Sequence, residues 1–278
     1  MSIRESFLVY RDFRYLKFAF ATVGGSLVWY VFDHPRGGPS GSSWLGYTLG
    51  TVGALIIVWL MWFGIRKRSY GPGHWRLEAW LSAHVYFGLA LLVIVTLHTG
   101  FRFHYDVHTL AYVLMVLVIV SGLLGVYVYV RYPRLMTESR HGTTLRVMLL
   151  EVADLDRRSR EACVDLSDEF ARAVEISHEH TRIGGSLSRH LRGSDPHCGT
   201  TRALAQVAEL AKSAPPERLE AVSRLLMALG RKQSLVAQIR RDLRYKALME
   251  AWLYLHVPLS FALLAALVAH IVSVFFYF

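Results

Sequence analysis

The chain has 278 residues, of which 53% are apolar and only 19% are charged, and its mean hydropathy is +0.32. This composition excludes an ordinary soluble protein and predicts apolar segments that cross a membrane. The 31 basic residues exceed the 21 acidic ones, a formal net charge of +10 that basic, membrane-orienting loops explain better than a nucleic-acid partner does. Two cysteines, Cys163 and Cys198, are too few for a disulfide framework, a four-thiolate zinc site or an iron–sulfur cluster.

Five apolar blocks predict an all-α, polytopic membrane protein with five transmembrane helices. Their approximate limits are residues 18–32, 45–65, 81–101, 110–130 and 252–278. Four of these blocks reach the roughly 20 residues that a spanning helix needs, and the first is shorter. We therefore expect residues 1–133 to hold the first four spans, residues 134–250 to form an insert, and residues 251–278 to form the fifth span.

The distribution of basic residues predicts the orientation of these spans. The N-terminal tail and the loop after the second span together carry eight basic residues, whereas the loops on the opposite side carry only Arg36 and Arg102. Because basic loops stay in the cytoplasm, we expect the N-terminus and residues 131–250 in the cytoplasm and the C-terminus outside. The expected location is the inner (plasma) membrane, with the spans in contact with lipid.

The insert before the fifth span is polar and carries apolar residues at helical spacing. Residues 145–174 and 219–243 each show this repeat, which predicts a cytoplasmic helical hairpin with a short extra helix near Thr201–Lys212. No glycine-rich phosphate loop, thiolate cluster or acid–base constellation indicates catalysis. The insert has 21 basic and 16 acidic residues between Arg131 and Glu250. We interpret it as a docking arm for a protein partner; the alternative is a solvated hairpin that only braces the bundle.

Four histidines lie inside the apolar blocks, His84 and His98 in the third and His256 and His270 in the fifth. The members of each pair are fourteen residues apart, so they share one face of a helix and lie roughly 21 Å apart along its axis. The third and fifth spans both run outward, which places His84 opposite His256 and His98 opposite His270. Two facing imidazoles can bind the iron of a haem through both of its axial positions.

A histidine inside a membrane can also act without a haem. A single one usually forms an interhelical hydrogen bond or belongs to a proton path. Four histidines with equal spacing in two parallel helices favour haem ligation instead. Zinc is disfavoured, because a pair of histidines lacks the additional ligands that zinc requires.

The paired His-x13-His helices resemble the transmembrane core of dihaem b-type cytochromes, including the ferric-reductase-like family. The resemblance covers about residues 45–130 and 252–278 and rests on the four histidines. It implies two haem b groups: His84 and His256 would bind the inner haem iron, and His98 and His270 the outer one. Ferric reductases carry a flavin and nicotinamide module after the last span. This chain shows no such module, so we do not expect it to take hydride from a nicotinamide by itself.

Further residues are candidate neighbours of the haems. Gly88 lies one turn after His84 on the same face, where a missing side chain leaves room for a macrocycle or for close helix packing. Arg102 is the candidate partner of the outer propionates, with simple anchoring as the alternative. The inner candidates are Arg66, Arg68, Arg76 and Arg244. Close helix packing is the favoured interpretation of Gly46, Gly50, Gly122 and Gly125, and Pro258 predicts a kink.

Titratable and aromatic residues gather at both membrane surfaces. The outer loop runs from Thr99 to His108 and supplies groups that can accept the protons of a quinol, unless it is an ordinary interfacial loop. A weaker cluster on the inner side consists of Tyr70, His74, Trp75 and Arg76.

Together these patterns predict an electron-transfer subunit of an oxidoreductase complex. It would be a dihaem cytochrome b that passes electrons between a quinone pool and a protein redox partner such as an iron–sulfur subunit. One alternative is a transmembrane reductase that delivers electrons to an external acceptor such as ferric iron. The other is a non-redox membrane scaffold or proton-relay protein.

Overall fold

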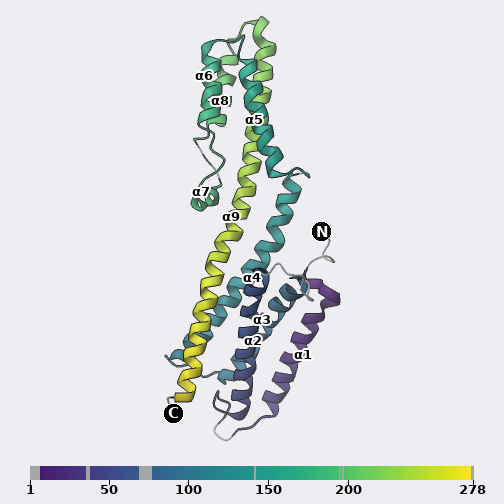
Figure 1. Ribbon diagram of the computed structural model, residues 1–278, viewed down its shortest axis with the longest axis vertical. Helices are drawn as coiled ribbons and strands as arrows, with labels where there is room; N and C mark the ends of the chain where they lie inside the picture. Colours follow the sequence, from purple (N-terminus) through teal and green to yellow (C-terminus); the bar gives the residue numbers. More distant parts are fainter. Residues whose placement is uncertain are drawn as a thin grey trace. The chain divides into compact units, whose positions relative to one another are not determined.

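The computed structural model describes residues 7–35, 38–68, 77–140, 142–193, 195 and 197–276, and every regular element in these ranges is helical (Figure 1). The expected all-α class is therefore confirmed. The helices are α1 (Tyr10–Phe32), α2 (Trp44–Arg68), α3 (Leu77–Thr99), α4 (Val107–Arg140), α5 (Leu145–Ala162), α6 (Asp168–Glu179), α7 (Leu187–Arg192), α8 (Gly199–Ala211) and α9 (Leu219–Phe276). Short 3₁₀ turns precede α1 and α9, at Phe7–Val9 and Pro216–Arg218.

Five of these helices, α1, α2, α3, α4 and α9, are long and apolar enough to cross a membrane. All five predicted spans are thus confirmed as helices of the length and composition that a membrane crossing requires. An apolar run of this length forms a helix in lipid because the helix satisfies its backbone hydrogen bonds internally. Two helices exceed their apolar blocks, since α4 continues to Arg140 and α9 begins at Leu219.

The chain divides into two compact units. Unit 1 consists of residues 1–130 and 252–278, and unit 2 consists of residues 131–251. The long helices α4 and α9 contribute residues to both units, and each unit has its own apolar core.

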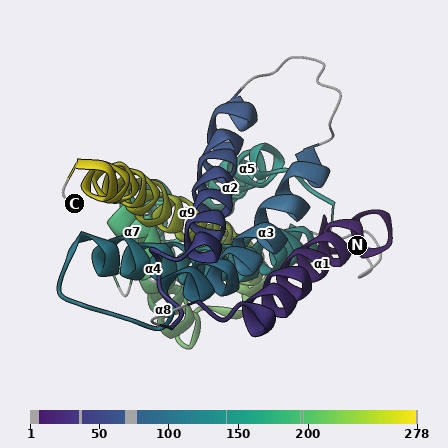
Figure 2. The same cartoon turned by 90° about the horizontal axis from the view of Figure 1, so that it is seen from below.

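The core of unit 1 is organised around α3, the most buried of the five candidate spans. One side of α3 packs against α1 and α2 (Figure 2), in a cluster that includes Ala19, Leu49 and Ile94. A second cluster joins Leu91 of α3 to residues of α2, α4 and α9, among them Met115 and Leu263. Side chains of α3 thus share apolar clusters with residues of all four other spans, and its closest helix neighbours are α1 and α2.

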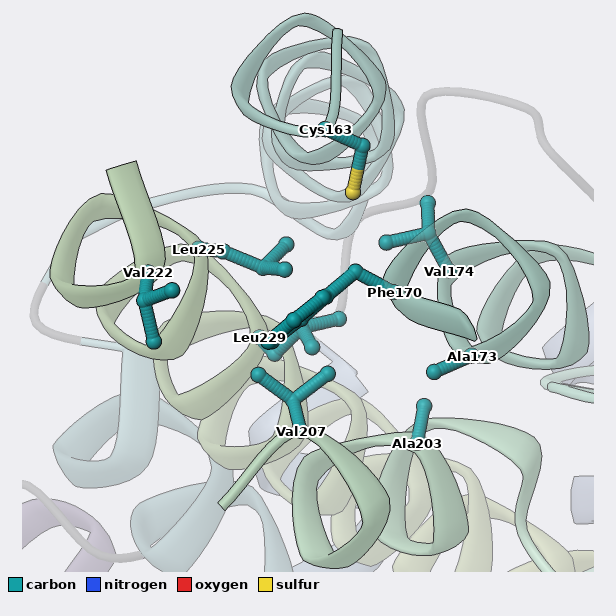
Figure 3. Close-up of a cluster of buried hydrophobic side chains, with 9 residues drawn as sticks. All are labelled: Cys163, Phe170, Ala173, Val174, Ala203, Val207, Val222, Leu225 and Leu229. Carbon is teal, nitrogen blue, oxygen red and sulfur yellow. The ribbon is translucent and has the colours of Figure 1, made fainter. Parts of the chain in front are cut away.

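Unit 2 contains α5, α6, α8 and the first part of α9, which is one long helix more than the hairpin and short extra helix expected from the sequence. Figure 3 shows Phe170 of α6 at the centre of its core, with Val207 of α8 and Leu229 of α9 around the ring. The expected short helix near Thr201–Lys212 corresponds to α8. The helical repeat predicted at 145–174 forms two helices. The first, α5, ends at a turn at Cys163, and Ser167 is the N-cap of the second, α6.

A buried lysine crosses the core of unit 2. Lys232 of α9 is only 1% exposed, and its ammonium group donates to the carboxylate of Asp156 on α5. The same group donates to the carbonyl oxygen and the hydroxyl of Ser177 on α6, each at 2.9 Å. All three protons of the ammonium group are used, which is the condition under which a buried charge is tolerated.

We expect Lys232→Met to destabilise unit 2 by about 3–5 kcal/mol, because it leaves the Asp156 carboxylate without its partner in the interior. Urea-dependent proteolysis of the detergent-solubilised full chain, followed at sites in residues 131–251, measures this change. Combining Lys232→Met with Asp156→Leu should recover much of the loss. The control is Lys212→Met, which removes an exposed ion pair with Glu209 and should change little. Equal effects of Lys232→Met and Lys212→Met would contradict the assigned role of Lys232.

Candidate functional site

The four membrane histidines lie within unit 1, on the facing helices α3 and α9. The rings of His98 and His270 have their centres 6.1 Å apart and their planes at 87°. The structure therefore brings His98 close to His270, and all four histidine side chains are partly buried.

His98 is held by the first turns of α2. Its Nδ1 atom lies 2.7 Å from the backbone oxygen of Gly46. A carbonyl oxygen only accepts hydrogen bonds, so Nδ1 must carry the ring proton and Nε2 must carry the lone pair. This contact fixes both the ring orientation and the nitrogen that remains available to a metal.

Gly50 provides the space for that ring. A Cβ atom at position 50 would lie 2.7 Å from Cε1 and 2.9 Å from Nδ1 of His98, which is too close for any side chain. The sequence predicted close packing of a neighbouring helix at Gly46 and Gly50, and at Gly50 this packing involves a side chain. What packs against Gly50 is the imidazole of His98.

His256 is held by a side chain of α4. Its Nδ1 atom lies 2.7 Å from the hydroxyl oxygen of Ser121, and that hydroxyl donates its proton to the carbonyl of Val118 at 2.8 Å. With the hydroxyl proton assigned to the Val118 carbonyl, Ser121 accepts a hydrogen bond from Nδ1 of His256. Nε2 again keeps its lone pair, as in His98.

Trp252 completes the surroundings of His256. Its ring stacks on the His256 ring at 5.1 Å between centres and 22° between planes. Its indole nitrogen donates to the backbone oxygen of Ser121 at 2.6 Å. The indole occupies a notch at Gly125, where a Cβ atom would come within 2.1 Å of the ring.

Sequence reasoning missed Ser121 and Trp252 as neighbours of the site. A signal for Ser121 was present, because a polar residue inside an apolar span usually faces the bundle and bonds to another helix. Trp252 stands at the end of a span, where aromatic residues are common at the lipid interface, so its contact with His256 had no distinct signal.

His84 and His270, the other members of the two pairs, have different surroundings from His98 and His256. His84 interacts with the backbone of Leu60 on α2. Leu60 is fourteen residues after Gly46, so the antiparallel helix α2 runs beside both histidines of α3. The Nδ1 atom of His270 is buried and makes no hydrogen bond within the part of the chain that the structure describes.

His108, the last residue of the outer-loop segment Thr99–His108, lies next to His270. The rings of His108 and His270 have their centres 4.5 Å apart, and Nδ1 of His108 lies 3.7 Å from a carboxylate oxygen of Asp106. Hydrogen bonds from Thr109 hold the pKa of Asp106 below its usual range, and nearby His108 acts in the same direction. His104 and Tyr105 are exposed.

The remaining predicted neighbours are placed as follows. A Cβ atom at Gly88 would meet no other atom within 4 Å, so α3 has open space at this position. Arg102 is exposed, and its guanidinium would lie 3.3 Å from a Cβ at Gly38 in the loop after α1. The helix α9 continues through Pro258. The inner cluster Tyr70, His74, Trp75 and Arg76 and the side chains of Arg66 and Arg68 lie outside the described residues, and Arg244 belongs to unit 2.

The described residues offer no site for a metal ion that is bound by protein ligands alone. Among the described residues, no group of three or more histidine, cysteine, aspartate or glutamate side chains could hold a metal ion. An ion bound by protein alone, such as zinc, needs at least three such ligands. A haem iron is held in its macrocycle and needs only two axial ligands, which a pair of histidines supplies.

Comparison of the chain with protein families, with curated proteins and with solved structures finds no significant match.

Proposed function

We propose that the chain is a membrane-embedded dihaem cytochrome b in which His84 with His256 and His98 with His270 are the axial ligands of two haem b groups. The observation that carries this proposal is the hydrogen bonding of His98 and His256. In both residues Nδ1 donates to a neighbouring helix and Nε2 retains a lone pair for a metal. Ligand histidines are typically held in this way by their second nitrogen.

The geometry of the His98–His270 pair fits the proposed group. Nε2 of His98 and a ring nitrogen of His270 would hold the iron between the two rings, which requires ring centres roughly 6 Å apart. The observed separation is 6.1 Å.

The proposed role is electron transfer between a quinone pool and a protein redox partner. Haem iron supplies reversible one-electron chemistry, and the protein supplies axial ligands, orientation and an apolar surrounding. Fourteen helical residues separate the two pairs, which corresponds to roughly 21 Å along the span. Sites at two depths favour electron transfer across the membrane over a single surface reaction. The basic residues place the N-terminus and residues 131–250 in the cytoplasm in this proposal.

The purified chain should contain two b-type haems. The sequence has no Cys-x-x-Cys-His run, so the haem should not be bound covalently and should be extracted by acidified organic solvent. A pyridine haemochrome assay measures the number of haems per chain, and His98→Ala and His84→Ala should each reduce it from two to one. A folded wild-type chain with one haem or none would refute the proposal.

Gly50→Ala should remove the haem of the His98–His270 pair, because the added methyl group would displace the His98 ring. The change favours helix formation, so weakening of α2 itself would not explain the loss. Gly53→Ala, one turn later on the same helix, is the matched control. Its Cβ would lie 3.0 Å from a methyl group of Val95, which can move, and it should keep both haems. The haem content and absorption spectrum of the two variants test this, and a Gly50→Ala variant identical to wild type would count against the site.

The two proposed haems should respond differently to a membrane potential, because their ligand pairs lie at different depths. Moving one charge across the whole membrane is worth about 2.3 kcal/mol per 100 mV, and the two sites should span a large part of this difference. The ferrous fraction of each haem, followed optically in proteoliposomes at a fixed redox poise, measures the effect. Identical responses of both haems to an imposed potential would place them at one depth.

A further inference from the structure

We propose that Ser121 is a positioning residue that sets the redox potential of the haem bound by His84 and His256. The inference rests on the proposed function and extends it to a residue of α4, a helix that contributes none of the four proposed ligands. Ser121 would act through the His256 ring.

The hydrogen bond that Ser121 makes within its own helix assigns the direction of its contact with His256. The Ser121 hydroxyl is buried, at 4% exposure, and its proton is committed to the carbonyl of Val118 in its own helix. This assignment makes Nδ1 of His256 the donor in the 2.7 Å contact between them. Burial excludes water as a competing acceptor, so the bond persists in one geometry.

A second contact fixes Ser121 itself. Trp252 lies one turn before His256 on α9, and its indole nitrogen donates to the Ser121 backbone oxygen at 2.6 Å while its ring stacks on His256. The hydroxyl and carbonyl of one serine thus hold two neighbouring side chains of α9. Gly125, one turn after Ser121 on α4, provides the notch for the indole.

The acceptor at Nδ1 controls how strongly the imidazole donates electrons through Nε2. A hydrogen bond from Nδ1 makes the ring more basic, which favours the ferric over the ferrous state of a bound iron. Removing the acceptor should therefore raise the midpoint potential of that haem. His98 has a backbone carbonyl as its acceptor, which no substitution can delete, whereas the acceptor of His256 is a side chain. The potential at the His84–His256 pair is consequently open to change by a single substitution.

The test compares Ser121→Ala with Ser121→Thr in the full-length protein. Spectroscopic redox titration gives the midpoint potential of each haem, and the His98→Ala variant, which retains only the His84–His256 haem, identifies which one changes. We expect Ser121→Ala to lower the ferric-to-ferrous ratio of that haem about tenfold at a given potential, which raises its midpoint by about 59 mV for one electron. Ser121→Thr keeps the hydroxyl and should stay close to wild type.

Ser26→Ala is the matched control, because this hydroxyl of α1 donates only to the carbonyl of Thr22 in its own helix. It should leave both potentials unchanged. If Ser121→Ala loses the haem instead, retention of that haem at its wild-type potential by Ser121→Thr still supports the assignment. An unchanged potential in Ser121→Ala, or a Thr variant that behaves like Ala, would overturn it. Absence of haem from the wild type would instead refute the proposed function.

Discussion

The packing of α3 at the centre of unit 1 is the constraint on which the candidate site depends. α3 shares one apolar cluster with α1 and α2 and a second one with α2, α4 and α9. Contacts on several sides leave a helix little freedom to rotate, because interiors are close-packed. The position of α3 sets the positions of its two histidines, and it brings the ring of His98 close to His270 of α9.

Hydrogen bonds between helices favour one relative position of the packed helices. Tyr86 of α3 donates to the backbone of Leu8, Thr96 of α3 contacts the hydroxyl of Tyr112 on α4, and Trp252 of α9 donates to the backbone of α4. In an apolar surrounding, each polar group needs a partner within the protein, so such bonds favour one register between neighbouring helices. The bonds at His98 and His256 belong to the same set and give each ring one proton position.

Unit 2 follows the rules of a water-soluble bundle. Its helices α5, α6 and α8 have one apolar face each, which meets α9 in two clusters around Phe170 and Ile239. The network of Lys232, Asp156 and Ser177 crosses this core and connects three helices. Its two cysteines are buried and free, and burial raises the pKa of the Cys163 thiol to about 11, so this group stays protonated at neutral pH.

The sequence by itself determined the all-α class, the five spans and the positions of the four histidines. These features are local: the length of an apolar block reports a membrane span, and a spacing of fourteen residues fixes a common helix face whatever the rest of the chain does. Only the tertiary structure decided what holds each ring, because Gly46 and His98 are 52 residues apart and Ser121 and His256 are 135 residues apart. Long-range packing also decided the architecture of unit 2. The periodicity of its sequence predicted helices, but it did not predict how many of them surround the core. The buried partners of Lys232 lie 55 and 76 residues away, and such pairings arise only when the helices pack.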